Sequence, residues 1–122
     1  MFEEYDIVAA PGVDKKFVYE IFRVISFLHL KTGLDIKNLI VIHNETDIPG
    51  CYDSEEDAFY ISEKGTLKVI ERKENSQYPQ IVISRLILTL FYFSKHMGED
   101  EQTATKFAED TLKQLDEELR NY

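Results

Sequence analysis

The hydrophobic pattern of the chain is dominated by one helix-length run, Ile81 to Met97, with the sequence IVISRLILTLFYFSKHM. Apolar residues occupy far more of it than the single stripe with which a surface helix packs on a core. Polar side chains interrupt the run at Ser84, Arg85, Thr89, Ser94, Lys95 and His96. The pattern therefore predicts a central helix that is packed on most of its sides.

A narrow polar face runs along this predicted helix. Four side chains follow one another at steps of four, three and four residues, which places them on one side of an α-helix: Arg85, Thr89, Tyr92 and His96. The simplest interpretation is the solvent-facing edge of a core helix, because charged side chains are rarely buried. The alternative is a surface that contacts a polar partner.

Two amphipathic helices are predicted, one before and one after the central helix in the sequence. From Lys15 to Lys31 apolar residues recur at steps of three and four, with Asp14 as the N-cap and Gly33 as the stop. Before the last helix, the acidic run from Glu99 to Glu101 suits the positive end of the helix dipole. Its apolar stripe consists of Ala104, Phe107, Ala108, Thr111 or Leu112, Leu115 and Leu119.

Between the first and central helices we predict three strands. Leu39 to His43 is a short β-rich run, Ala58 to Ile61 is a second, and Thr66 to Glu71 alternates polar and apolar residues. Turns are predicted at Pro49-Gly50 with the acidic segment after it, and at Glu63 to Gly65. With a short arm or half-turn from Met1 to Ala10, the expected fold is α+β with a small, mostly antiparallel sheet.

Length and charge narrow the classes of function. The 122 residues suit one domain, residues 1–122, with one core. A net charge of −9 argues against direct binding to nucleic acid or to an anionic membrane surface, since both require basic patches. Acidic runs such as Asp53 to Asp57 either form a solvated face or meet a basic protein surface.

Cysteine content and the N-terminal residues indicate a cytoplasmic protein. Cys51 is the only cysteine, so an intramolecular disulfide and a multi-cysteine zinc site are excluded. Acidic residues follow Met1 in place of the basic and apolar regions of a signal peptide. The uncharged stretch from Leu86 to Phe93 is too short to cross a bilayer, which takes about 20 residues.

The sequence offers little catalytic chemistry and indicates no cofactor. His29, His43 and His96 lie in three different predicted elements, and no nucleophile-elbow sequence accompanies them. Phosphate-binding glycine motifs are also missing from the sequence. One metal alternative remains, in which His96 acts with Glu99 or Glu101, because imidazole and carboxylate groups can together hold a divalent ion.

From Leu39 onward the chain resembles a minimal zincin of the ImmA/IrrE type, metallopeptidases found with phage repressors and mobile elements. The resemblance rests on Gly50 to Asp53, on Phe59 to Ile61, on the apolar run IVISRLILTLFYF, and on Thr103 to Ala108. It implies a leading helix and a small sheet before an apolar helix that carries HExxH, followed by a helix with a third zinc ligand.

The chain departs from that pattern at the metal ligands. Ser84 to Leu88 stands where HExxH is expected, and Thr103 replaces the third ligand. HExxH requires two imidazoles on one helix face and a glutamate to activate water. The resemblance therefore implies a fold of this class without catalysis and without a bound metal.

We expect a non-catalytic, zincin-like protein-binding domain, a phage or mobile-element regulator, inhibitor or immunity-type factor whose partner has a basic surface. The alternatives are an acidic nucleic-acid mimic that blocks a DNA- or RNA-binding protein, a metal-dependent hydrolase using His96 and nearby carboxylates, and a structural oligomer. The predicted binding residues combine tyrosine anchors with acidic groups that steer association. They are Tyr52, Asp53, Glu55, Glu56, Asp57, Arg85, Thr89, Tyr92 and His96.

Overall fold

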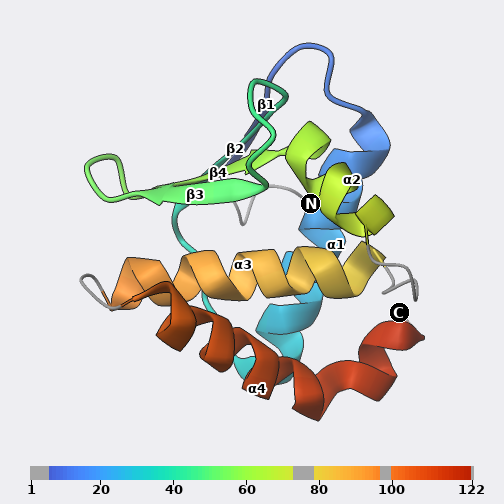
Figure 1. Ribbon diagram of the computed structural model, residues 1–122, viewed down its shortest axis with the longest axis vertical. Coiled ribbons are helices and arrows are strands. Elements are labelled where there is room, and N and C mark those ends of the chain that lie inside the picture. Colours follow the sequence, from blue (N-terminus) through green and yellow to red (C-terminus); the bar gives the residue numbers. More distant parts are fainter. Residues whose placement is uncertain (1–5, 73–78, 97–99, 122) are drawn as a thin grey trace.

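A computed structural model describes residues 6–72, 79–96 and 100–121, and over these residues the chain is an α+β structure of four helices and one mixed four-stranded sheet (Figure 1). The elements in chain order are β1 (Ile7–Ala9), α1 (Lys15–Thr32), β2 (Leu39–His43), β3 (Gly50–Asp53), β4 (Ala58–Ser62), α2 (Glu63–Arg72), α3 (Pro79–Lys95) and α4 (Glu101–Arg120). The predicted fold class is confirmed, and the details of the sheet differ.

The sheet has the strand order β1-β2-β4-β3, and most of it is parallel. β1 pairs with β2 in parallel, β2 pairs with β4 in parallel, and only β3 runs antiparallel to its neighbour β4. The prediction of a mostly antiparallel sheet is therefore wrong. Helix α1 returns the chain from β1 to β2 in the same direction, which is the connection that parallel strands require.

Local sequence signals locate α1 correctly. The Asp14 side chain accepts a hydrogen bond of 2.8 Å from the Lys16 backbone N–H, so the predicted N-cap is confirmed. Gly33 adopts a left-handed conformation with φ of 74°, and its N–H donates to the His29 carbonyl. A residue without Cβ adopts this conformation at little cost, and the helix ends there.

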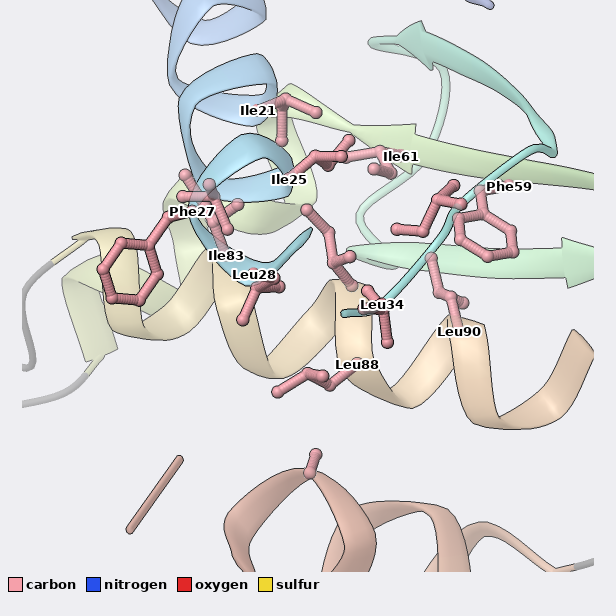
Figure 2. Packing of buried hydrophobic residues seen from close by; sticks show 14 of the residues in the cluster. Ile21, Ile25, Phe27, Leu28, Leu34, Phe59, Ile61, Ile83, Leu88 and Leu90 are labelled. Atoms are coloured by element: carbon pink, nitrogen blue, oxygen red, sulfur yellow. The ribbon is translucent and has the colours of Figure 1, made fainter. Parts of the chain in front are cut away.

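The apolar run forms the central helix α3, as predicted. Figure 1 shows α3 between the sheet on one side and α4 on the other. Ile83 and Leu90 of α3 belong to one cluster with Ile25 of α1 and Phe59 of β4 (Figure 2). The predicted stripe of α4 is also confirmed, with Ala104, Ala108, Leu112, Leu115 and Leu119 buried. Met97, named as the end of the central run, lies outside the described residues.

The segment predicted as a third strand, Thr66 to Glu71, is instead part of helix α2. The predicted turn from Glu63 to Gly65 is its first turn. The actual additional strand is β3, within the segment that we interpreted as an acidic loop, and it forms a hairpin with β4. Alternation in Thr66 to Glu71 was misleading because Val69 and Ile70 are adjacent, which suits a helix face better than one side of a sheet.

A buried carboxylate joins three elements at the start of α2. Glu63 is 8% exposed, and its Oε2 accepts a hydrogen bond of 3.2 Å from the Asp14 backbone N–H. Its Oε1 accepts one of 2.9 Å from the Asn44 side-chain amide. The side-chain oxygen of Asn44 in turn accepts from the Lys64 backbone N–H. This network links the N-terminus of α1, the residue after β2 and the first turn of α2.

None of the helices in the described residues has the length and apolar character that a membrane span requires.

Replacing Gly65 with alanine tests how closely α2 packs on the loop before β3. Alanine normally stabilises a helix interior by about 1 kcal/mol relative to glycine. Here the added Cβ would lie 2.6 Å from the Ile48 carbonyl carbon and 2.8 Å from the Asp47 carbonyl oxygen. We therefore expect Gly65→Ala to lower the free energy of unfolding, by about 1 to 3 kcal/mol, as measured by urea denaturation.

The matched control is Glu71→Ala, which removes an exposed side chain from the same helix. It should change the free energy of unfolding by less than about 0.5 kcal/mol. A Gly65→Ala variant more stable than the wild type would show that α2 does not press on this loop.

Candidate groove between β3 and α3

A groove of about 670 Å³ lies beside the sheet and is bounded by β3, α2, α3 and the first residues of α4. Its surface is mainly apolar, with Arg85 and Glu101 as charged groups. The lining residues are Ile48, Pro49, Gly50, Cys51, Tyr52, Ser54, Thr66, Val69, Val82, Arg85, Leu86, Thr89, Leu90, Phe93, Glu101 and Thr105.

One face of α3 forms the floor of the groove. The lining positions on this helix, from Val82 to Phe93, follow steps of three and one residues, as expected for one side of an α-helix. At 1.5 Å per residue they extend for about 17 Å. An extended chain rises about 3.4 Å per residue, so the groove has the length of about five residues of a strand.

Strand β3 is an edge of the sheet and runs beside this floor. Its register with β4 pairs Gly50 with Ile61 and Tyr52 with Phe59, while the Ser62 N–H donates to the Pro49 carbonyl at 2.8 Å. Hydrogen-bonded and non-hydrogen-bonded pairs alternate in an antiparallel ladder. The backbone N–H and C=O groups of Gly50 and Tyr52 therefore point away from β4, toward the uncovered edge.

Gly50 lets the edge strand approach α3 closely. A Cβ at this position would lie 3.0 Å from Leu86 Cδ1, 3.3 Å from Leu90 Cδ1 and 2.9 Å from the Tyr60 carbonyl oxygen. Any other residue would need α3 or β4 to move. The glycine therefore sets the width of the groove where β3 begins.

The acidic turn between β3 and β4 is tied together by hydrogen bonds from tyrosines. Tyr52 Oη donates to Asp57 Oδ1 at 2.6 Å, and Tyr60 Oη donates to Glu56 Oε2 at 2.9 Å. Asp57 also accepts from the Asn38 side-chain amide at 2.6 Å. These bonds to carboxylates raise the pKa of Tyr52 and that of Tyr60, because each phenol loses its bond and meets a negative charge when it ionises.

The structure divides the predicted binding residues into separate groups. Tyr52, Arg85 and Thr89 come together in the lining of the groove. Tyr92 and His96 lie outside that lining and stack on each other, with ring centroids 4.3 Å apart, while the Tyr92 ring also packs 5.2 Å from Phe107 of α4. The predicted polar face of the central helix is therefore divided: Arg85 and Thr89 line the groove, whereas Tyr92 and His96 lie outside it, with Tyr92 beside α4.

The acidic members of the predicted set belong to the hairpin turn. Asp53 Oδ1 accepts from the Glu55 backbone N–H at 2.9 Å and so shapes the turn. Glu55, Glu56 and Asp57 are exposed. They follow the C-terminal end of β3, where they contribute negative charge beside the groove.

The resemblance to zincins placed the HExxH motif at Ser84 to Leu88. Ser84 and Leu88, which stand at its two histidine positions, do not line the groove. Ser84 and Leu88 have no exposed surface, and the Ser84 hydroxyl donates to the Gln80 carbonyl. Arg85 and Thr89, one residue further along, line the groove instead. Helix α3 thus presents no imidazole or carboxylate there, since the sequence from Ile81 to Lys95 contains no His, Asp or Glu.

The described residues do not form a metal-binding site of the kind considered from the sequence. They contain no group of three or more His, Cys, Asp or Glu side chains placed to hold an ion. Glu101 lines the groove, whereas His96 stacks on Tyr92, and Glu99 lies outside the described residues. Cys51 is an exposed free thiol.

Sequence reasoning missed the residues that α2 contributes, Thr66 and Val69, because this segment was interpreted as a strand. It also missed the role of Gly50 in the groove, because this residue was interpreted as part of a turn and as part of the family resemblance. A helical reading of Thr66, Val69 and Ile70, spaced three and four residues apart, would have indicated a buried helix face. Nothing in the local sequence indicates that β3 stays unpaired on one side.

Comparison of the chain with known protein families, with curated proteins and with solved structures finds no match.

The bond between Tyr52 and Asp57 gives a titration that checks the hairpin. In Asp57→Asn the asparagine backbone can still adopt the positive φ of 52° found at this position, but the negative charge of the side chain is removed. We expect the pKa of Tyr52 to fall toward its ordinary value, as measured by NMR titration of the tyrosine ring carbons. The pKa of Tyr60 should be unchanged in this variant, because Glu56 is its main partner.

The raised pKa of Tyr52 also determines how the stability of the hairpin changes with pH. A phenol whose pKa is raised in the folded state adds stability below its unfolded pKa and loses that contribution as pH rises through the folded value. The contribution of these phenols to the stability of the hairpin should therefore be lost in the alkaline range. Equal pKa values for Tyr52 in the wild type and in Asp57→Asn would exclude the hydrogen bond.

Proposed function

We propose that the protein is a non-catalytic binding module that holds an extended segment of another protein in the groove between β3 and α3. The observation that carries this proposal is the juxtaposition of an unpaired strand edge with an apolar groove of matching length. The edge offers backbone hydrogen bonds at Gly50 and Tyr52, and the groove offers contacts to side chains. Strand addition uses this combination, since backbone bonds supply affinity and pockets for alternate side chains supply specificity.

Charge supports a partner segment that has basic residues beside apolar ones. The chain carries a net charge of −9, and negative groups lie beside one end of the groove, where α4 begins with Glu101 and the acidic turn follows β3 (Figure 1). Opposite charge on the partner would increase the association rate and favour one orientation. The floor of the groove consists mainly of apolar side chains such as Leu86 and Phe93.

The zincin-like classification and the role as a phage or mobile-element regulator, inhibitor or immunity-type factor remain part of this proposal. Their support is the resemblance in sequence, together with an apolar helix that lacks the residues for metal-dependent hydrolysis. Binding without catalysis is what such a helix can provide, because the groove positions of α3 carry Arg85 and Thr89 in place of imidazole ligands.

Selection of peptides provides the test. A phage-displayed library of random heptapeptides is selected on the immobilised full chain, and enriched peptides are measured for binding to the wild type and to Val69→Glu. Val69 is half-buried and lines the groove, so a carboxylate there should abolish binding of groove peptides. The matched control is Leu67→Glu on the same helix, 44% exposed and outside the groove lining, which should bind normally.

Hydrogen exchange locates the bound peptide. We expect the amides of Gly50 and Tyr52 to exchange more slowly in the complex, since each would donate to the added strand. Enriched peptides should contain Lys or Arg, and their affinity should fall as the salt concentration rises. Peptides that bind Val69→Glu as well as the wild type, or leave both amides unprotected, would contradict the proposal. So would a selection that yields no enriched peptide.

A further inference from the structure

The wall of the groove formed by α2 contains a buried hydroxyl group without a partner. Thr66 has no exposed surface, and its Oγ1 makes no hydrogen bond within the described residues. This atom has almost no solvent-accessible surface. A polar group buried without a partner costs stability, and it is retained where something else compensates.

Three other hydroxyls on the helices are satisfied by the backbone of their own helix. The Thr32 hydroxyl donates to the Leu28 carbonyl at 2.6 Å, Ser84 donates to Gln80 at 2.6 Å, and Thr89 donates to Arg85 at 2.8 Å. Each of these bonds reaches back four residues, which is the usual solution for a hydroxyl in a helix. Thr66 differs from these three, although the Ser62 carbonyl lies four residues before it.

The surroundings of Thr66 favour an isosteric apolar residue. Val69 on the same helix, Val82 on α3 and Ile48 before β3 all line this part of the groove. Valine has nearly the shape of threonine and would leave no polar atom unpaired. A hydroxyl in this setting therefore has no structural purpose that the free protein reveals.

We propose that Thr66 is a specificity-determining residue of the groove, whose hydroxyl pairs with a polar side chain, such as Ser, Thr, Asn or Gln, on the bound segment. This inference rests on the proposed function. Threonine in a helix has two accessible orientations about its Cα–Cβ bond, so its hydroxyl can occupy either of two positions. Because Thr66 lines the groove but has no exposed surface in the free protein, this pairing requires the bound segment to displace the side chains that cover Oγ1.

Recognition of this kind discriminates strongly because it penalises the wrong ligand. A site with a buried hydrogen-bonding group rejects a ligand that leaves the group unpaired, whereas an apolar wall discriminates little between similar side chains. Thr66 would thus select one polar side chain within a segment that is otherwise apolar and basic. The groove would bind far fewer sequences than its apolar lining alone permits.

Two substitutions at this position separate recognition from structure. Thr66→Val removes the hydroxyl and keeps the shape, while Thr66→Ser keeps the hydroxyl. Heptapeptides selected on the wild type should bind Thr66→Val about tenfold more weakly and should bind Thr66→Ser with little change. Thr66→Val should melt at the same temperature as the wild type or higher, because it loses an unpaired buried hydroxyl. A purely structural role would lower the melting temperature of Thr66→Val.

Parallel selection on Thr66→Val gives an independent readout. Peptides from the wild type should share a polar residue at one fixed position, and peptides from Thr66→Val should have an apolar residue there. If groove-dependent peptides bind both proteins equally, the inference about Thr66 is wrong and the proposed function stands. If no peptide depends on the groove, both are overturned.

Discussion

The apolar circumference of α3 is the constraint on which the rest of the structure depends. A helix with hydrophobic residues on nearly every side must be covered from several directions to remove that surface from water. The sheet and α1 cover one side of α3, and α4 covers another (Figure 1). Coverage is incomplete along the face from Val82 to Phe93, and that face is the floor of the groove.

The sheet produces the second half of the site through its topology. Three strands run parallel and are followed or preceded by helices, whereas β3 is reached by a hairpin and remains at the edge. An edge strand leaves backbone groups available for pairing, and proteins usually protect such edges with charge or with covering elements. Here the acidic turn supplies charge at one end, and α3 supplies an apolar surface alongside. The same edge strand, β3, is thus protected by the acidic turn and by α3 and still has backbone groups available for binding.

The candidate site was only partly predictable, for reasons that differ between its residues. Arg85 and Thr89 were identified because polar residues at these places interrupt an apolar run, and Tyr52 was identified because a tyrosine beside acidic residues suits a binding surface. Tyr92 was grouped with them by helical spacing, but α4 supplies Phe107 as a packing partner and turns that part of the helix into a different environment. Thr66 was missed because its segment carries both a strand-like alternation and a helix-like spacing. The hydrogen bonds of Glu63, which connect the first turn of α2 to α1 and to the residue after β2, favour the helix.

The sequence by itself determined the local structure of the chain: the central apolar helix, the capped ends of α1, the stripe of α4, and the strands β2 and β4. These follow from the spacing of apolar residues and from capping chemistry, both of which act over a few residues. Tertiary structure alone decided strand direction, the place of β3 at the edge, and the helical state of α2. Those features depend on contacts between residues such as Gly65 and Ile48, or Gly50 and Leu86, which are distant along the chain.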